Sequence, residues 1–205
     1  MTPPIRPTGF RSALLSGILC AAAFLNSSCA SAITPVYEYK EGALPSIRFM
    51  LPGDIPLELV TLPAGSIAMQ VNRKPASNET VDKDGRVVYK FKENELSVGK
   101  FEVTQAQWQA VMKTTQKQLS EAARPGGKAF GIGADLPVYD VSAEQAKEFC
   151  DRLNKSLPSS FRYRFTLPNE AEWEYACRAG TTTELNNGRE LRARNNVSMA
   201  LGEIA

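Results

Sequence analysis

The segment that most constrains the fold is residues 165–181, Phe-Thr-Leu-Pro-Asn-Glu-Ala-Glu-Trp-Glu-Tyr-Ala-Cys-Arg-Ala-Gly-Thr. Asn169 is typical of a helix N-cap, because its side-chain oxygen can accept a hydrogen bond from a backbone N–H two or three residues later. Glu172 occupies the third helical position, from which its carboxylate can bond back to the Asn169 N–H in a capping box. The segment therefore predicts a helix that begins directly after Asn169.

The same helix carries an apolar stripe and a stop signal. Trp173 and Cys177 are four residues apart and share one helical face, which we expect to be buried. Gly180 can adopt the left-handed conformation that commonly ends a helix. Asn169, Glu172, Trp173, Cys177 and Gly180 together predict a short helix that belongs to the scaffold of the protein.

Three acidic residues in this helix allow a second interpretation, an acidic metal site or acid/base cluster. Glu170 and Glu174 share one side of the helix, but Glu172 points elsewhere, because residues two apart do not face each other. Acidic side chains in the first turn also favour the helix dipole. We therefore favour capping and structural roles and assign no catalytic, cofactor-binding or metal-binding residue.

Composition excludes several classes of function. The chain has 205 residues, which suits one domain, and it contains no histidine. Serine or cysteine nucleophiles paired with histidine, and metal sites built on histidine, are therefore excluded. Without Arg6 and Arg11 near the N-terminus, the 24 basic residues fall to 22, which equals the 22 acidic residues. No basic block indicates nucleic-acid binding.

Residues 1–32 are typical of an export signal. The basic residues are followed by an apolar run from Ser12 to Leu25, which is too short for a comfortable membrane span. A small-x-small site predicts cleavage after Ala32, and no membrane span is expected after cleavage. The lesser alternative is a lipoprotein acylated at Cys29. Either interpretation predicts a bacterial-type exported protein that is periplasmic or extracellular.

Two cysteines remain outside the signal, Cys150 and Cys177. An exported protein can form disulfides, so these residues are a possible disulfide pair. Two buried thiols that act as small hydrophobic residues are an equally good interpretation.

The chain between the signal and residue 165 shows several further elements. Residues 33–56 are rich in proline and predict a linker with an entry strand, so the domain is expected to span 57–205. Residues 57–62 and 67–71 predict a hairpin, and the alternating run 161–165 predicts a short strand.

Capping boxes predict two helices that begin after Thr104 and Ser142. Trp108 is expected on the buried face of the first. The glycine- and proline-rich residues 120–137 predict a loop.

The segment 167–181 resembles the formylglycine-generating enzyme, or sulfatase-modifying factor, family with high specificity. Residues 101–108, residues 136–142 and Phe149-Cys150 add weaker similarity in the family's order, so that the resemblance covers roughly 57–190. It implies a loop-rich α+β fold related to C-type lectins.

The resemblance also implies an activity. Enzymes of this family oxidise a sulfatase cysteine to formylglycine with oxygen and a thiolate-bound copper ion, and calcium ions belong to the complete domain. The copper-binding cysteines follow a Gly-Asn-x-Trp-Glu-Trp motif in the C-terminal half. This chain has neither that motif nor any cysteine after Cys177.

We therefore expect an N-terminal portion of such a domain, incomplete at the C-terminus, without cofactor ligands and not catalytic alone. The alternative is a non-catalytic, exported, lectin-like module that binds a protein or peptide ligand, and a chain that does not fold stably alone is a third possibility. Cys150 and Cys177 fall where some family members have structural disulfide partners.

Overall fold

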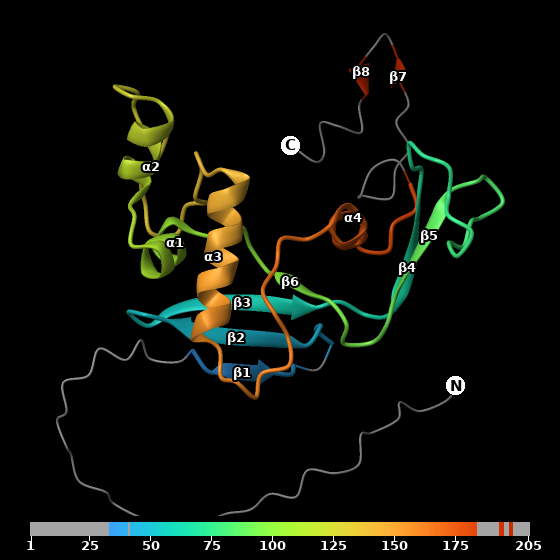
Figure 1. Ribbon diagram of the computed structural model, residues 1–205, viewed down its shortest axis with the longest axis horizontal. Coiled ribbons are helices and arrows are strands. Elements are labelled where there is room, and N and C mark those ends of the chain that lie inside the picture. Colours follow the sequence, from blue (N-terminus) through green and yellow to red (C-terminus); the bar gives the residue numbers. More distant parts are fainter. Residues whose placement is uncertain (1–32, 41, 184–192, 195–196, 199–205) are drawn as a thin grey trace, which may run out of the picture. The chain divides into compact units, whose positions relative to one another are not determined.

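The computed structural model describes residues 33–40, 42–183, 193–194 and 197–198 (Figure 1). The predicted signal peptide and Cys29 lie outside the described residues. Within the described part, no helix has the length and apolar character needed to cross a membrane. The strands pair antiparallel and the helices follow separately, which is the predicted α+β class.

The main sheet has four antiparallel strands in the order β1-β2-β3-β6. Their bounds are β1 Pro35–Glu38, β2 Ser46–Leu51, β3 Ile55–Thr61 and β6 Ser97–Gly99. Phe49 pairs with Pro35 on one side and with Leu57 on the other. Because side chains alternate between the faces of a strand, Ile47, Phe49 and Leu51 share one face, and all three are buried.

The prediction that residues 33–56 form a linker is wrong. This segment forms β1, β2 and the start of β3, and Phe49 is completely buried. Ile33 is also buried, and its backbone N–H donates to the Ser156 carbonyl at 2.9 Å. The apolar alternation in β2 is short and lies between Pro45 and Pro52, so its period of two is a weak signal in the sequence.

Three helices cover the buried face of this sheet or pack beside it. They are α1 Gln105–Met112, α2 Gln116–Ala123 and α3 Ala143–Ser156. The predicted capping boxes at Thr104 and Ser142 are confirmed. Helix α2 was not predicted, although Thr115 and Gln118 form a third capping box at its start. Lys113 ends α1 in a left-handed conformation, with φ of 62°, and the N-cap of α2, Thr115, follows two residues later.

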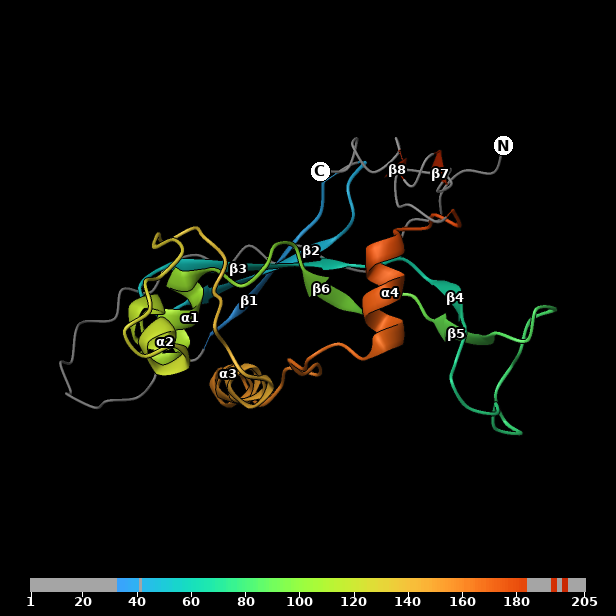
Figure 2. The same cartoon turned by 90° about the horizontal axis from the view of Figure 1, so that it is seen from above.

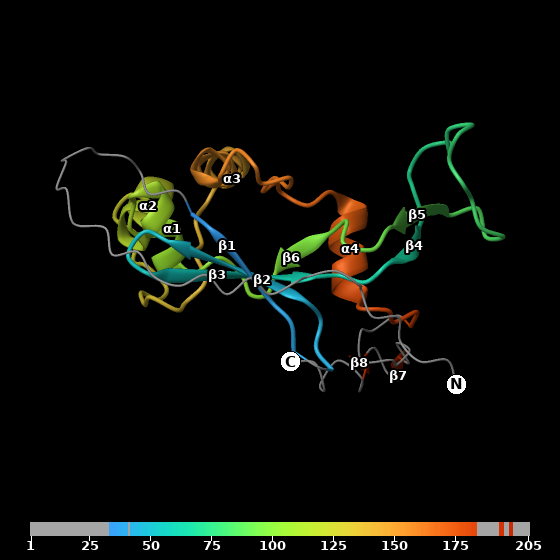
Figure 3. The same cartoon turned by 90° about the horizontal axis from the view of Figure 1, so that it is seen from below.

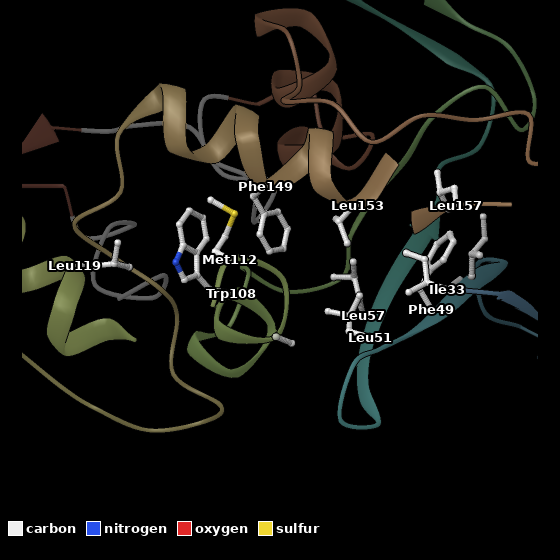
Figure 4. Close-up of a cluster of buried hydrophobic side chains, with 12 residues drawn as sticks. Ile33, Phe49, Leu51, Leu57, Trp108, Met112, Leu119, Phe149, Leu153 and Leu157 are labelled. Carbon is white, nitrogen blue, oxygen red and sulfur yellow. The ribbon is translucent and has the colours of Figure 1, made fainter. Parts of the chain in front are cut away.

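The core joins these helices to the sheet (Figure 4). Trp108 of α1 stacks on Phe149 of α3, with 5.4 Å between the ring centroids and 2° between the ring planes. The Trp108 Nε1–H donates to Thr114 Oγ1 at 2.9 Å, so its one polar atom is satisfied inside the core. Figure 2 shows α1 beside α3. The buried position predicted for Trp108 is therefore confirmed.

A second, two-stranded sheet consists of β4 Gly65–Met69 and β5 Val87–Phe91. The last described helix, α4 Glu170–Arg178, packs against β4 (Figure 3). The predicted hairpin between 57–62 and 67–71 is wrong, because β2 and β6 occupy both edges of β3. Two short strands, β7 Ala193–Arg194 and β8 Val197–Ser198, form a separate antiparallel pair.

Residues 161–165 form an irregular segment and not the predicted strand. The Asn154 side chain satisfies the Phe165 backbone as a neighbouring strand would. Its Nδ2 donates to the Phe165 carbonyl and its Oδ1 accepts from the Phe165 N–H, both at 2.8 Å. The rings of Phe161 and Phe165 pack edge-on against Phe49, with centroids 5.6 Å and 5.1 Å away. The alternating aromatic residues therefore reach the core from a fixed loop.

The glycine-rich loop is held by two buried glutamines. Gln105 Nε2 donates to the Gly131 and Pro137 carbonyls. Gln116 bonds to both the N–H and the carbonyl of Tyr139. Buried polar side chains that satisfy loop backbone groups in this way fix a segment that has no regular structure.

Candidate functional site

The capped helix α4 forms as predicted at its N-terminus. Asn169 Oδ1 accepts from the Glu172 N–H at 3.0 Å, and Glu172 Oε2 accepts from the Asn169 N–H at 2.8 Å. At the other end the left-handed conformation begins one residue earlier than predicted, at Ala179 with φ of 47°, and continues at Gly180 with φ of 85°. Two consecutive left-handed residues therefore end the helix.

Replacing Asn169 with alanine is expected to lower the free energy of unfolding by about 1 kcal/mol, because one backbone N–H of the first turn loses its acceptor. Urea denaturation followed by circular dichroism measures this change. Asn169→Asp is the matched control, since aspartate caps as well as asparagine. Equal stability of the alanine variant and the parent would contradict the assigned role.

The inward face of α4 is anchored by Tyr175. Its ring stacks on Phe91 of β5 with centroids 4.4 Å apart, and its hydroxyl donates to the Pro63 carbonyl at 3.0 Å. Gly65 allows this approach, because a Cβ at that position would lie 2.4 Å from the Tyr175 hydroxyl oxygen. The sequence interpretation missed this contact, although Ala171 and Tyr175 are four residues apart and could have indicated the face.

The buried position predicted for Trp173 is wrong. Its side chain is 58% exposed, and Cys177, on the same side of the helix, is exposed too. Ala171 and Tyr175 face the β4–β5 sheet, and Trp173 lies two positions from each of them. Two positions correspond to a rotation of about 200° at 3.6 residues per turn, which turns Trp173 away from the sheet.

Two of the three acidic residues in α4 have structural partners. Glu172 completes the capping box, and Glu174 forms an ion pair with Arg178 at 2.7 Å. The described residues contain no group of three or more histidine, cysteine, aspartate or glutamate side chains that could hold a metal ion. The acidic residues of α4 therefore act on the helix itself.

Cys150 and Cys177 are not joined by a disulfide. They lie on α3 and α4, and α3 packs against α1 whereas α4 packs against β4. The possible mutual disulfide is therefore not formed. The interpretation as two buried thiols is also wrong for Cys177, which is exposed, while Cys150 is half-buried.

Burial raises the pKa of the Cys150 thiol, and the nearby negative charge of Asp151 raises this pKa further. The Cys150 thiol therefore stays protonated up to a higher pH than an ordinary cysteine does. Because the thiolate is both the nucleophile and the metal ligand, this environment disfavours either role for Cys150.

Alkylation of Cys150 by iodoacetamide at mildly alkaline pH is expected to be slower in the folded chain than in the urea-denatured chain. The raised pKa lowers the thiolate fraction at a given pH, and half-burial limits access. Peptide-resolved mass spectrometry reads Cys150 separately from the other cysteines. The pH midpoint of the folded-state rate should lie above the midpoint of the denatured chain, and a lower midpoint would contradict the environment described.

These residues do not fit a copper(I) site. Such a site needs cysteine thiolates brought together around a soft ion. In the described part the two sulfurs belong to different helices, and Cys150 is held as a thiol. The described residues likewise do not offer the clustered carboxylates that a calcium site uses.

The family model described as the sulfatase-modifying factor enzyme 1-like domain matches residues 54–202, which is well over half of the chain. Neither a curated protein nor a solved structure matches the chain. The matched range begins just before β3 and includes α1, α3 and the capped helix α4. Strands β1 and β2 precede it.

Proposed function

Because the chain belongs to the family of sulfatase-modifying factor enzyme 1-like domains, we propose that it acts as a sulfatase-modifying-factor-type domain on a protein or peptide partner. The observation that carries this proposal is the family match across residues 54–202. The four capped helices and the antiparallel sheets of the described part supply the scaffold for such a partner. We also propose that this fold is related to the fold of C-type lectins.

We further propose that the chain does not itself convert cysteine to formylglycine. In this family, thiolate-bound copper and oxygen supply the oxidation of the substrate cysteine. What supports the proposal is that Cys150 and Cys177 lie on separate helices and that burial keeps Cys150 protonated. The residues of this chain then contribute positioning: Tyr175 holds α4 on the β4–β5 sheet, and Asn169 fixes where α4 begins.

The test is incubation of the purified full chain with copper(I), oxygen and a peptide that carries a sulfatase cysteine motif. Mass spectrometry detects conversion of the thiol to an aldehyde, and a competing chromophoric chelator measures copper binding. We expect no turnover and no stoichiometric copper(I) binding. Turnover would overturn the proposal. Copper binding lost in a Cys150→Ser or Cys177→Ser variant would show that these residues ligate the ion after all.

A second candidate function is a non-catalytic, exported, lectin-like module that binds a protein or peptide. Trp173 favours it, because this large aromatic side chain is exposed on a helix whose opposite face is firmly packed. Exposed aromatic residues are enriched at binding surfaces. A displayed peptide library, screened against the chain and against a Trp173→Ala variant, distinguishes the two candidate functions. Specific peptide binding that the variant loses supports the binding module.

We propose export to the periplasm or the exterior, with cleavage after Ala32. The burial of Ile33 and its hydrogen bond to the Ser156 carbonyl support this proposal, because the folded domain then begins at the first residue after the cleavage site. Intact mass of the secreted protein is the test. A mass that retains Cys29 together with a diacylglyceryl group would support the lipoprotein alternative and overturn cleavage after Ala32.

A further inference from the structure

A groove of about 440 Å³ lies at one end of the main sheet, beside the loop that follows α3. Its lining includes Tyr37 and Tyr39 at the end of β1, Ser97 of β6, and Arg162 and Tyr163 of the loop after α3. Its volume is within the range of about 300–1,000 Å³ that is usual for small-molecule sites. We name these residues the tyrosine groove.

The tyrosine groove has one firmly held wall. Tyr163 packs edge-on against Phe161 with centroids 5.8 Å apart, and Phe161 packs against the fully buried Phe49. Asn154 fixes the far end of the same loop through both backbone groups of Phe165. Arg162 and Tyr163 are therefore carried by a segment whose backbone is tied to the core at both ends, which limits how far the two residues move when a ligand binds.

Of the two charged side chains that line the groove, only Arg162 is left without an ion pair in the described residues. Glu38 also lines the groove, but its carboxylate is paired with Arg48 at 2.8 Å. Arg162 makes no side-chain hydrogen bond or ion pair with any described residue. Among the described residues its guanidinium is thus a planar donor without a partner, and such a group matches a carboxylate through two parallel hydrogen bonds.

The remaining lining is aromatic or neutral and polar. Tyr37, Tyr39 and Tyr163 are exposed, and Ser46, Ser97 and Asn94 offer hydroxyl and amide groups beside them. An aromatic face, which carries partial negative charge, attracts the C–H groups on one face of a saturated sugar ring. Hydroxyls and an amide can both donate to and accept from ligand hydroxyls.

We propose that the tyrosine groove binds an acidic sugar, a pyranose that carries a carboxylate. The sugar ring stacks on the tyrosine faces, its hydroxyls bond to the serine and asparagine side chains, and its carboxylate bonds to Arg162. An acidic peptide is the less suitable ligand, because its several charges would meet only one unpaired cation in the groove. The proposal holds whether or not the domain is catalytic.

The groove draws residues from both sides of the N-terminal boundary of the family match. Tyr37 and Tyr39 belong to the β1–β2 region, which precedes the matched residues 54–202, whereas Arg162 and Tyr163 lie inside them. The groove is therefore built in part from strands that precede the family match.

The experiment titrates the purified full chain with cellobiouronic acid, with cellobiose as its neutral counterpart, and with the peptide acetyl-Glu-Ser-Glu-amide, which carries two charges. Isothermal calorimetry or amide chemical shifts measure the dissociation constants. We expect the acidic disaccharide to bind roughly tenfold more tightly than cellobiose, because it adds a charge-assisted pair of hydrogen bonds. Equal or tighter binding of the peptide, or no binding of either sugar, would overturn the proposal.

Variants locate the site. Arg162→Gln should remove the preference for the acidic sugar, while Arg164→Gln, an exposed arginine of the same loop outside the groove lining, should keep it. Tyr37→Ala should weaken both sugars without loss of fold, because this side chain is 65% exposed. If Arg164→Gln has the same effect as Arg162→Gln, the interaction is non-specific and the proposal fails.

Discussion

Trp108→Ala is expected to destabilise the domain by about 3–5 kcal/mol, whereas Trp173→Ala should change stability by no more than about 0.5 kcal/mol. Trp108 is 3% exposed, stacks on Phe149 and satisfies its indole N–H through Thr114. Its removal leaves a large cavity between α1 and α3 and an unpaired Thr114 hydroxyl. Trp173 is 58% exposed, so its removal takes away little packing.

The two tryptophans are a matched pair, because each follows the N-cap of a capped helix by four residues. Guanidinium denaturation at constant pH gives both changes in the free energy of unfolding. Comparable losses in the two variants would mean that a partner element covers Trp173 in solution and that α4 is buried on both sides. A small loss for Trp108→Ala would contradict the core described above.

Phe49→Ala is expected to cost about 3–5 kcal/mol as well. This side chain is fully buried on β2, in edge-on contact with Phe161 and Phe165. Its truncation removes the support of the loop that carries Arg162. The variant should therefore also weaken sugar binding in the tyrosine groove, an effect on a site that Phe49 itself does not line.

Met50→Ala is the control for this prediction, because it lies next to Phe49 on the opposite, partly exposed face of β2. Thermal unfolding of the two variants separates them clearly, since the control should lose less than about 1 kcal/mol. If Phe49→Ala were tolerated as well as Met50→Ala, residues 33–56 would be a dispensable linker after all.

The parts of the fold that were predicted correctly depend on neighbours in the sequence. The boxes at Thr104, Ser142 and Asn169 each join residues three apart, so the pattern of side chains contains the whole interaction. Helix α2 follows the same rule, because Thr115 and Gln118 form its capping box, but the glycines and prolines that follow it favour a loop in the sequence.

The errors concern which segments meet across long distances. The β3–β4 hairpin was predicted from nearness in sequence, but β6, which lies about 40 residues later, occupies the edge of β3. The alternation at 161–165 fitted a strand, yet Asn154 satisfies the backbone of Phe165 in place of a neighbouring strand. The tyrosine groove could not be predicted either, because its residues come from five separate segments of the chain.

The sequence alone determined the family, the capped start of α4 and the absence of histidine chemistry, because each of these is a local pattern or a count. Only the tertiary structure decided which tryptophan is buried. Trp108 and Trp173 follow the same capping pattern. Trp108 packs against Phe149 of α3, whereas on α4 it is Tyr175, and not Trp173, that occupies the inward face. A helical pattern shows which residues share a face, and only the packing partner selects the face that is buried.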